Sequence, residues 1–174
     1  MFRLQCEAEE ERWEVEALFD SAFGPGRIAL SAYRLREGVP PVAELSLTAR
    51  DEFRTLCGAI RFWPFLVDEE PALLLGPVAV HPTRQGEGLG GLLIRDGVDR
   101  ARDLGWRDVF LIGDQPYYGR FGFSQVQGIT FPPPTDPARI LHFSPIGAEC
   151  GLQGSAGKWS GGSGVQIQRR SDSL

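Results

Sequence analysis

The first part of the chain shows helix-like and strand-like spacing of its apolar residues. Residues 2–6 are predicted to form a short strand, and residues 9–23 a helix whose first turn is acidic, as the helix dipole favours. A Gly-Pro-Gly turn at residues 24–26 ends this helix, and a shorter helix is predicted over residues 28–36. The apolar face predicted for the first helix consists of Trp13, Ala17, Leu18 and Phe23.

Strand-like spacing follows. Leu45, Leu47 and Ala49 alternate with polar residues, which is the period of a half-buried strand. Residues 55–62 are predicted to be the partner of this strand. Residues 72–80 contain the longest apolar run and are predicted to form a further strand.

The clearest helix is predicted over residues 89–104, and Gly105 is expected to end it. Beyond it the pattern predicts a strand at residues 109–112, a short helix or turn at residues 116–120, and a late strand at residues 140–143. The residues predicted on the buried face of the helix are Leu89, Leu92, Leu93, Val98, Ala101 and Leu104.

The order of these elements predicts an α+β fold, because antiparallel strands come first and a strand–helix–strand unit follows. We expect a single domain over residues 1–159. The chain becomes rich in Gly and Ser from residue 151, and residues 160–174 are expected to form a flexible C-terminal tail.

Composition narrows the class of protein. The 174 residues and 42% hydrophobic content suit one globular domain with a filled core. Lys and Arg number 18 against 23 Asp and Glu, and the net charge of −5 argues against a nucleic-acid partner or an anionic membrane. The longest apolar run is far shorter than the roughly 20 residues of a membrane helix, and no signal-peptide pattern is seen, so we expect a cytoplasmic protein.

Cysteine and histidine give no metal-binding pattern. Cys6, Cys57 and Cys150 are widely spaced and contain no Cys-x-x-Cys pair, so reduced thiols are expected rather than disulfides or a zinc site. His142 has no partner motif, and His81 precedes a proline at a strand end. Structural roles are therefore predicted for both histidines, and no metal site is predicted.

The segment from Val80 to Gly91 carries the strongest chemical signal, a strand followed by a Gly-rich turn that opens a helix. Because the first N–H groups of a helix lack internal partners, such a turn can hold phosphates. Gly86, Gly88 and Gly91 also fit the dinucleotide motif G-x-G-x-x-G, which would suit a nucleotide-dependent reductase. That interpretation is disfavoured, since five residues separate the strand from the first glycine and too little chain follows.

Two motifs here resemble the GNAT superfamily of N-acetyltransferases. Gln85-x-x-Gly88-x-Gly90 resembles the loop with which that family binds the pyrophosphate of coenzyme A. Tyr118-x-x-x-Gly-Phe resembles the element that follows the next strand in the family. The surrounding residues are most similar to the bacterial YhbS-like branch, and the resemblance is clear over residues 73–134.

The resemblance implies a GNAT-like, mostly antiparallel central sheet with splayed middle strands, flanked by helices. The residues agree with this implication. Pro77 lacks an N–H and Gly76 weakens pairing, so a bulge or an unpaired stretch is expected there, and Pro116 limits the neighbouring strand. Two strands that part at their C-terminal ends would leave a V-shaped gap.

In the family this gap takes the pantetheine arm of acetyl-coenzyme A (acetyl-CoA). By the resemblance, Val78 and Val80 would contact the arm through their main chain. Arg84 would either help to neutralise the phosphates or be solvated. The residues on which the resemblance places the pyrophosphate are Gln85, Gly86, Gly88, Gly90 and Gly91.

The implied activity is an acetyl-CoA-dependent N-acetyltransferase that moves an acetyl group directly to a primary amine of a small molecule or peptide, without a metal. Tyr118 would be the general acid, since a phenol stays protonated while a thiolate forms. A backbone N–H near Val78 would stabilise the oxyanion. The general base stays open between Asp114, His81, a water chain and an amine that arrives neutral.

An alternative of a different class is a non-catalytic acyl-CoA sensor of the same fold. It rests on the predicted strand over residues 72–80, which lacks the Glu that many relatives carry there. The sequence specifies neither the acceptor amine nor the oligomeric state, and it allows a homodimer.

Overall fold

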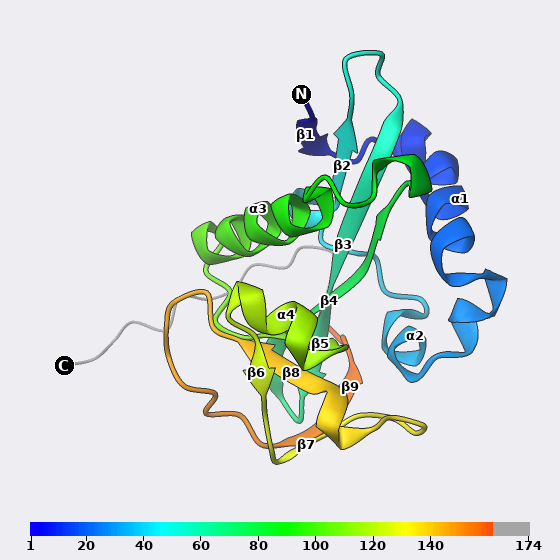
Figure 1. Cartoon of the computed structure of the whole chain (residues 1–174). Coiled ribbons are helices and arrows are strands. Elements are labelled where there is room, and N and C mark those ends of the chain that lie inside the picture. Colours follow the sequence, from blue (N-terminus) through cyan, green and yellow to red (C-terminus); the bar gives the residue numbers. More distant parts are fainter. Residues whose placement is uncertain (162–174) are drawn as a thin grey trace.

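A computed structural model describes residues 1–161, apart from the side chains of residues 28, 29 and 31. Within this part of the chain, nine strands form a mostly antiparallel sheet in the order β1-β2-β3-β4-β5-β8-β6, and β9 pairs with both β3 and β7 (Figure 1). The strands are β1 (Arg3–Cys6), β2 (Leu47–Arg50), β3 (Leu56–Val67), β4 (Glu70–Val80), β5 (Val109–Ile112), β6 (Ser124–Gln125), β7 (Ile129–Thr130), β8 (Ile140–Phe143) and β9 (Gly154–Lys158).

Helices cover both faces of the sheet (Figure 1). Ala59 of β3 packs against α1 and the next residue, Ile60, belongs to the core beneath α3, because neighbouring residues of a strand point to opposite faces. The expected α+β architecture is confirmed. The α-helices are α1 (Arg12–Phe23), α2 (Ser31–Arg36), α3 (Leu89–Asp103) and α4 (Gln115–Tyr118), and the 3₁₀ turns are η1 (Glu9–Glu11), η2 (Pro25–Ala29), η3 (Ala43–Leu45), η4 (Pro82–Arg84), η5 (Gly119–Phe121) and η6 (Pro137–Arg139).

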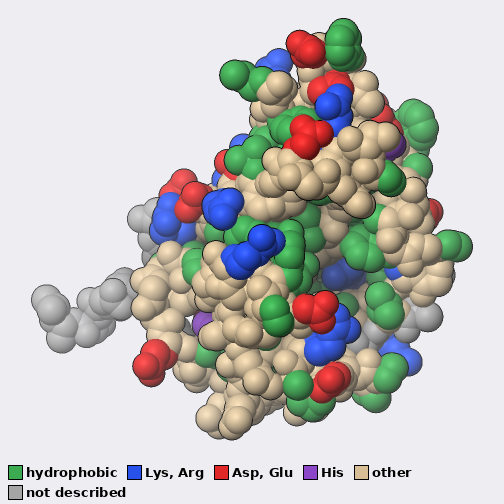
Figure 2. Space-filling model, in the orientation of Figure 1, with side chains coloured by type: hydrophobic (Ala, Val, Ile, Leu, Met, Phe, Trp, Pro, Cys, Tyr) green, Lys and Arg blue, Asp and Glu red, His purple; other side chains and the backbone are tan. Residues whose placement is uncertain are grey.

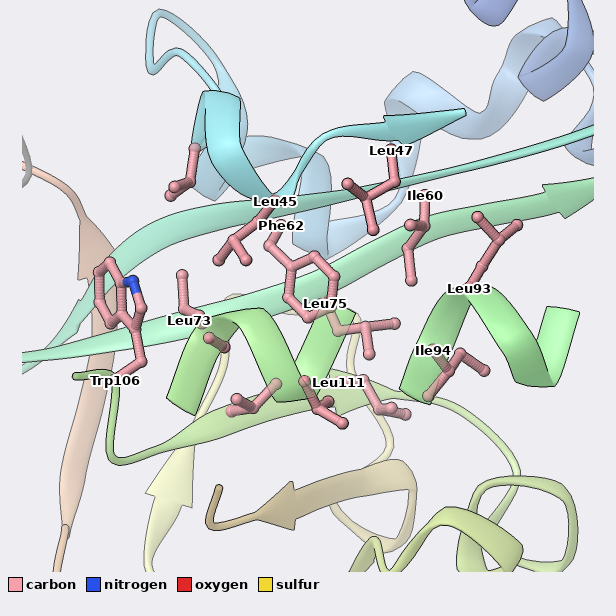
Figure 3. Close-up of a cluster of buried hydrophobic side chains, with 14 of the residues drawn as sticks. Leu45, Leu47, Ile60, Phe62, Leu73, Leu75, Leu93, Ile94, Trp106 and Leu111 are labelled. Atoms are coloured by element: carbon pink, nitrogen blue, oxygen red, sulfur yellow. The ribbon is translucent and has the colours of Figure 1, made fainter. Parts of the chain in front are cut away.

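The largest core lies between α3 and the sheet (Figure 3). Phe62, Leu73 and Leu93 are completely buried in it. Gly97 faces the ring of Phe62 so closely that a Cβ atom at this position would lie 2.5 Å from a ring carbon. The helix can therefore approach the sheet this closely only with glycine at position 97.

The faces predicted for two helices need correction. In α1 the buried residues are Val15, Leu18 and Phe19, whereas Trp13 is 74% exposed and Phe23 is half exposed. The helix meets the sheet along an i, i+3, i+4 stripe. Trp13 and the exposed Ala17 lie outside that stripe, whereas Phe23 continues it at the last residue of the helix. Two residues predicted for the buried face of the second long helix, Leu92 in α3 and Leu104 directly after it, are each 42% exposed. No described helix has the length and apolar character to cross a membrane.

Several strand predictions also change. Leu45 lies in η3 and β2 begins only at Leu47, while β3 extends five residues beyond the predicted end at residue 62. β9 was not predicted, and it pairs with Phe65–Val67 of β3, beyond the part of that strand that β2 covers. Most of the predicted flexible tail, residues 162–174, lies outside the described residues.

The predicted splay between the middle strands is confirmed. β4 and β5 are parallel but pair only at Leu73–Val109 and Leu74–Phe110. Beyond this point β4 carries a bulge, because Ile60 pairs with Val78 whereas Phe62 pairs with Leu75. Gly76 and Pro77 of β4 together lie opposite the single residue Arg61 of β3, so β4 carries one extra residue there. The C-terminal half of β4 is thus paired with β3 on one edge only.

Candidate active site

The loop between β4 and α3 is shaped by local features of the sequence. The Nδ1 atom of His81 accepts a hydrogen bond from the backbone N–H of Thr83, which starts the turn η4. Gly86 (φ 85°) and Gly88 (φ 77°) then adopt left-handed conformations that glycine tolerates best. The first hydrogen bond of α3 runs from the N–H of Leu92 to the carbonyl of Gly88. The N–H groups of the preceding residues therefore stay available at the positive end of the helix.

A pocket of about 410 Å³ lies against this helix end. Six of the seven residues predicted to bind the cofactor line it, and the exception is Val78. The pocket residues that had been predicted are Val80, Gln85, Gly86, Gly88, Gly90 and Gly91. Arg84, for which the sequence left phosphate binding and solvation open, also lines the pocket. The lining residues that had not been predicted to bind are Leu89, Arg95, Tyr117, Arg120 and Phe121.

Two of the residues that line this pocket are glycines, whose lack of a side chain leaves the backbone accessible. A Cβ atom at Gly90 would lie 3.1 Å from the hydroxyl oxygen of Tyr117, and one at Gly91 would lie 3.0 Å from the ring of Phe121. A side chain at either position would fill space next to the free amides. The two glycines thus leave room for a bulky group to reach the backbone, which is what a pyrophosphate needs.

Three arginines give the pocket a positive character. Arg84 forms an ion pair with Asp51 at 2.8 Å, so it fastens the loop to the β2–β3 turn. Arg95 and Arg120 are exposed and form no ion pair with any residue from 1 to 161. Figure 2 shows Lys and Arg side chains over the face that carries α3 and α4. Two uncompensated cations beside a helix N-terminus favour a polyanionic ligand.

Aromatic rings hold these two cations in place. The guanidinium group of Arg95 lies 5.0 Å from the ring centre of Phe121, and that of Arg120 lies 4.5 Å from the ring centre of Tyr117. The Nε atom of Arg120 also donates a hydrogen bond to the carbonyl of Tyr117 at 3.2 Å. Such contacts orient both charges while leaving donor groups for a ligand.

The unpaired edge of β4 leads away from the pocket with its backbone groups exposed to the gap. The N–H of His81 donates to the carbonyl of Cys57 at 2.8 Å, so these residues form a hydrogen-bonded pair. Hydrogen-bonded and non-hydrogen-bonded pairs alternate along an antiparallel ladder. Val80 and Val78, paired with Gly58 and Ile60, fall on the non-bonded positions. Their N–H and C=O groups therefore point away from β3, toward the side of β5.

Tyr118 ends α4 and lies against the main core, outside the pocket lining. Its ring packs edge-on against Tyr117, with ring centres 4.9 Å apart, and over Gly113, where a Cβ atom would lie 2.5 Å from it. Burial raises the pKa of Tyr118 to about 12, with the nearby Tyr117 and Asp114 acting in the same direction. The phenol therefore keeps its proton throughout the neutral range.

The residues that had been considered as general bases have partners elsewhere. Asp114 is exposed and lies 3.3 Å from Arg139 as an ion pair. The Nδ1 atom of His81 is 2.8 Å from the hydroxyl of Thr83 and holds the turn described above. Neither residue lines the pocket, so the general base stays open.

Comparison with known proteins decides the family. The sequence profile of the acetyltransferase (GNAT) family matches residues 3–123. The chain belongs to the GNAT family. Two curated Escherichia coli relatives are uncharacterised N-acetyltransferases, YjhQ (37% identical) and YhbS (32% identical), each over 111 residues. The match covers 62% and 63% of this GNAT chain but only 61% and 65% of the relatives, which is less than two thirds of either.

Solved structures of other GNAT proteins share the fold. The crystal structure of Escherichia coli YhbS in complex with CoA has a TM-score of 0.75 and 24% identity, and the match covers 89% of this chain and 88% of that one. A GNAT acetyltransferase from Brucella melitensis in complex with acetyl-CoA has a TM-score of 0.67 and 28% identity, over 92% and 97% of the two chains. The predicted membership of a YhbS-like GNAT group is thus confirmed.

Proposed function

We propose that this GNAT chain is an acetyl-CoA-dependent N-acetyltransferase that passes the acetyl group directly to a primary amine of a small molecule or peptide. The observation that carries the proposal is the continuity of two features. The amide-rich, positively charged pocket at the start of α3 adjoins the unpaired edge of β4. A ligand with a diphosphate at one end and an extended amide-containing arm at the other matches both features. The Brucella relative was crystallised with acetyl-CoA.

The phosphate end of the donor would be held by the backbone of the Gly-rich loop. We assign the pyrophosphate to the N–H groups at Gly86, Gly88, Gly90 and Gly91, with the side chain of Gln85 beside them. Arg95 and Arg120 are added to these predicted ligands, because their charges are uncompensated and line the same pocket. Charge-assisted hydrogen bonds of this kind are about twice as strong as neutral ones.

The pantetheine arm would use Val80 and Val78 as a partner strand. Both residues direct backbone groups into the gap, so the arm can pair with β4 as β5 does nearer its start. The N–H of Val78 is then the oxyanion donor, because Pro77 before it has no N–H to offer. Donors of this kind typically contribute a few kcal/mol to transition-state stabilisation, about 3 by mutagenesis of one such donor.

Acetyl-CoA supplies an activated thioester to the reaction. The amine nitrogen forms the new C–N bond, the C–S bond breaks, and the leaving sulfur takes a proton from the hydroxyl of Tyr118. Solvent returns that proton, and the proton lost by the amine goes to a base or to water. Positioning of the two reactants by the gap can account for about 7–11 kcal/mol of the barrier.

One observation favours the non-catalytic sensor as a second candidate. Asp114 and His81 each have a partner outside the pocket, and the strand beside the gap has no carboxylate between Ala72 and Val80. A protein that binds acyl-CoA without transferring the acyl group would need no base.

Two measurements on the full chain separate these functions. Calorimetry with CoA and acetyl-CoA tests the pocket, and both functions predict binding, whereas absence of binding would contradict both. Thiol release from acetyl-CoA in the presence of polyamines, aminoglycosides, amino acids and peptides then tests transfer. Release that depends on an amine supports the enzyme, and binding without release for any amine supports the sensor. Binding of NAD(P) instead of CoA would contradict both functions.

A further inference from the structure

A cluster of Asp108, His142 and Cys150 lies outside the proposed acetyl-CoA site. Asp108 precedes β5, His142 is on β8, and Cys150 follows in the segment that connects β8 to β9. The antiparallel pairing of β5 with β8 brings the first two together, with 2.8 Å between the Nε2 atom of His142 and a carboxylate oxygen of Asp108. One donor atom from each of the three residues lies within 4.8 Å of the other two.

This geometry distinguishes between two kinds of site. A nucleophilic Cys–His–Asp relay holds the thiol and the carboxylate on opposite ring nitrogens, so that the imidazole separates them. Here the sulfur of Cys150 and the carboxylate of Asp108 are themselves within 4.8 Å of each other. Three donor atoms that converge in this way enclose a common point, as the ligands of a metal ion do.

We infer that Asp108, His142 and Cys150 form a binding site for a divalent transition-metal ion, with Zn²⁺ as the ion that fits best. Carboxylate, imidazole and thiolate are all established ligands of Zn²⁺, and a mixed set of one sulfur, one nitrogen and one oxygen suits a borderline-soft ion. The charges also match, because a carboxylate and a thiolate together neutralise a divalent cation while the imidazole binds neutral. On binding, the sulfur–metal bond replaces the S–H bond and the proton leaves to solvent.

The surroundings supply room for a fourth ligand. A second pocket of about 410 Å³ is lined by His142 and Cys150 and also by Ser144 and Glu149. A three-residue zinc site usually leaves its fourth position to water or to another ligand. The pocket opens that position to solvent, or to Glu149 from the same connecting segment.

The role that follows is to fasten the connecting segment, residues 144–153, to the sheet. His142 is 7% exposed and its ring lies 5.0 Å from that of Phe110, so it provides a rigid attachment point. Cys150 is only partly buried and lies four residues before the start of β9 in the sequence. A metal bond at Cys150 would therefore help to fix the position from which β9 pairs with β3. This pocket shares no lining residue with the one at α3, so metal binding and CoA binding can be tested separately.

The test uses the full chain, stripped of metal with a chelator, and Co²⁺ as an optical probe. We expect one equivalent of Co²⁺ to produce ligand-field bands together with a thiolate-to-cobalt charge-transfer band, and Zn²⁺ to displace it. Cys150→Ser should abolish the charge-transfer band and weaken Zn²⁺ binding at least about tenfold. The matched control is Cys6→Ser, which removes an exposed thiol elsewhere and should leave binding unchanged.

Thermal unfolding gives a second measurement. Zn²⁺ should raise the Tm of the wild type and of Cys6→Ser but not that of Cys150→Ser, because only an ion that binds the native state stabilises it. Cys150 is the residue of choice, since replacing the buried His142 could unfold the chain. A wild type that takes up no Co²⁺, or a Cys150→Ser variant with the wild-type spectrum and Zn²⁺ affinity, would overturn the proposal whether or not the protein binds CoA.

Discussion

Removal of the two uncompensated arginines from the α3 pocket should weaken CoA binding through the phosphates alone. Arg95 and Arg120 line the pocket, are fixed over aromatic rings, and lack acidic partners among residues 1–161. We therefore expect Arg95→Gln and Arg120→Gln each to reduce the affinity for CoA, and the double variant to reduce it further. The glutamines remove the charge and keep a polar, although shorter, side chain.

The size of the effect follows from the exposure of the two side chains. Charge-assisted hydrogen bonds contribute about 1.5–3 kcal/mol, but screening reduces exposed pairs to about 1 kcal/mol or less. We take about 1 kcal/mol for each arginine, which corresponds to about fivefold in Kd, and about 30-fold for the double variant if the effects add. Arg102 is on the same helix, is paired with Asp99 and does not line the pocket, so Arg102→Gln is the matched control.

Calorimetry at two salt concentrations provides the assay. CoA binding by the wild type should weaken as salt increases, and the double variant should show a smaller dependence, because the lost interactions are the ones that salt screens. A pantetheine thioester without phosphates should bind wild type and double variant alike. The reasoning would be refuted by a double variant that binds CoA within twofold of the wild type, or by an equal loss for the phosphate-free ligand.

Three further variants test the core, the general acid and the buried ion pair. Gly97→Ala should lower the free energy of unfolding in urea by about 1–3 kcal/mol, because overpacking against Phe62 outweighs the roughly 1 kcal/mol gained in helix propensity. Tyr118→Phe should lower kcat while leaving the Kd for CoA unchanged, and since burial raises the pKa of Tyr118 to about 12, the wild-type rate should show no decline from this group near pH 10. Arg61→Gln should cost about 3–5 kcal/mol in urea unfolding, because it leaves the carboxylate of Glu7, 2.6 Å away, buried without its partner.

Specific results would contradict each of these expectations. A Gly97→Ala protein more stable than the wild type would show that Phe62 can move aside. An unchanged kcat in Tyr118→Phe would remove Tyr118 from the reaction. A loss below about 1 kcal/mol in Arg61→Gln would mean that the buried pair is no more valuable than a surface one.

The parts of the site that could be predicted were those encoded locally. The Gly-rich loop and the start of α3 follow each other in the sequence, so the spacing of Gln85, Gly88 and Gly90 was enough to identify them. The splay of β4 from β5 was equally predictable, because Pro77 has no N–H to donate to a neighbouring strand. Arg95 and Arg120 were missed because they reach the pocket only through the rotation of α3 and the packing of α4.

Features that depend on long-range pairing or on uneven burial escaped prediction. β9 consists of Gly, Ser, Ala and Lys, so it shows no alternation of apolar residues, and its strand conformation comes from its pairing with β3 and β7. Trp13 is apolar but exposed, which the spacing could not reveal because folded proteins leave much apolar surface in water. His142 gained its partner Asp108 only through the β5–β8 ladder.

Because the ladder between β4 and β5 is incomplete, the sheet can bind an extended ligand that forms the missing hydrogen bonds. β4 pairs with β5 at Leu73 and Leu74. In the described part of the chain, the residues of β4 after Leu74 have no partner strand on that edge. A ligand that forms hydrogen bonds with the backbone of Val78 and Val80 would take the place of a strand. It would then complete the sheet as well as take part in the reaction. The same backbone hydrogen bonds then contribute to both the fold and ligand binding. The protein with bound ligand should therefore have the larger free energy of unfolding.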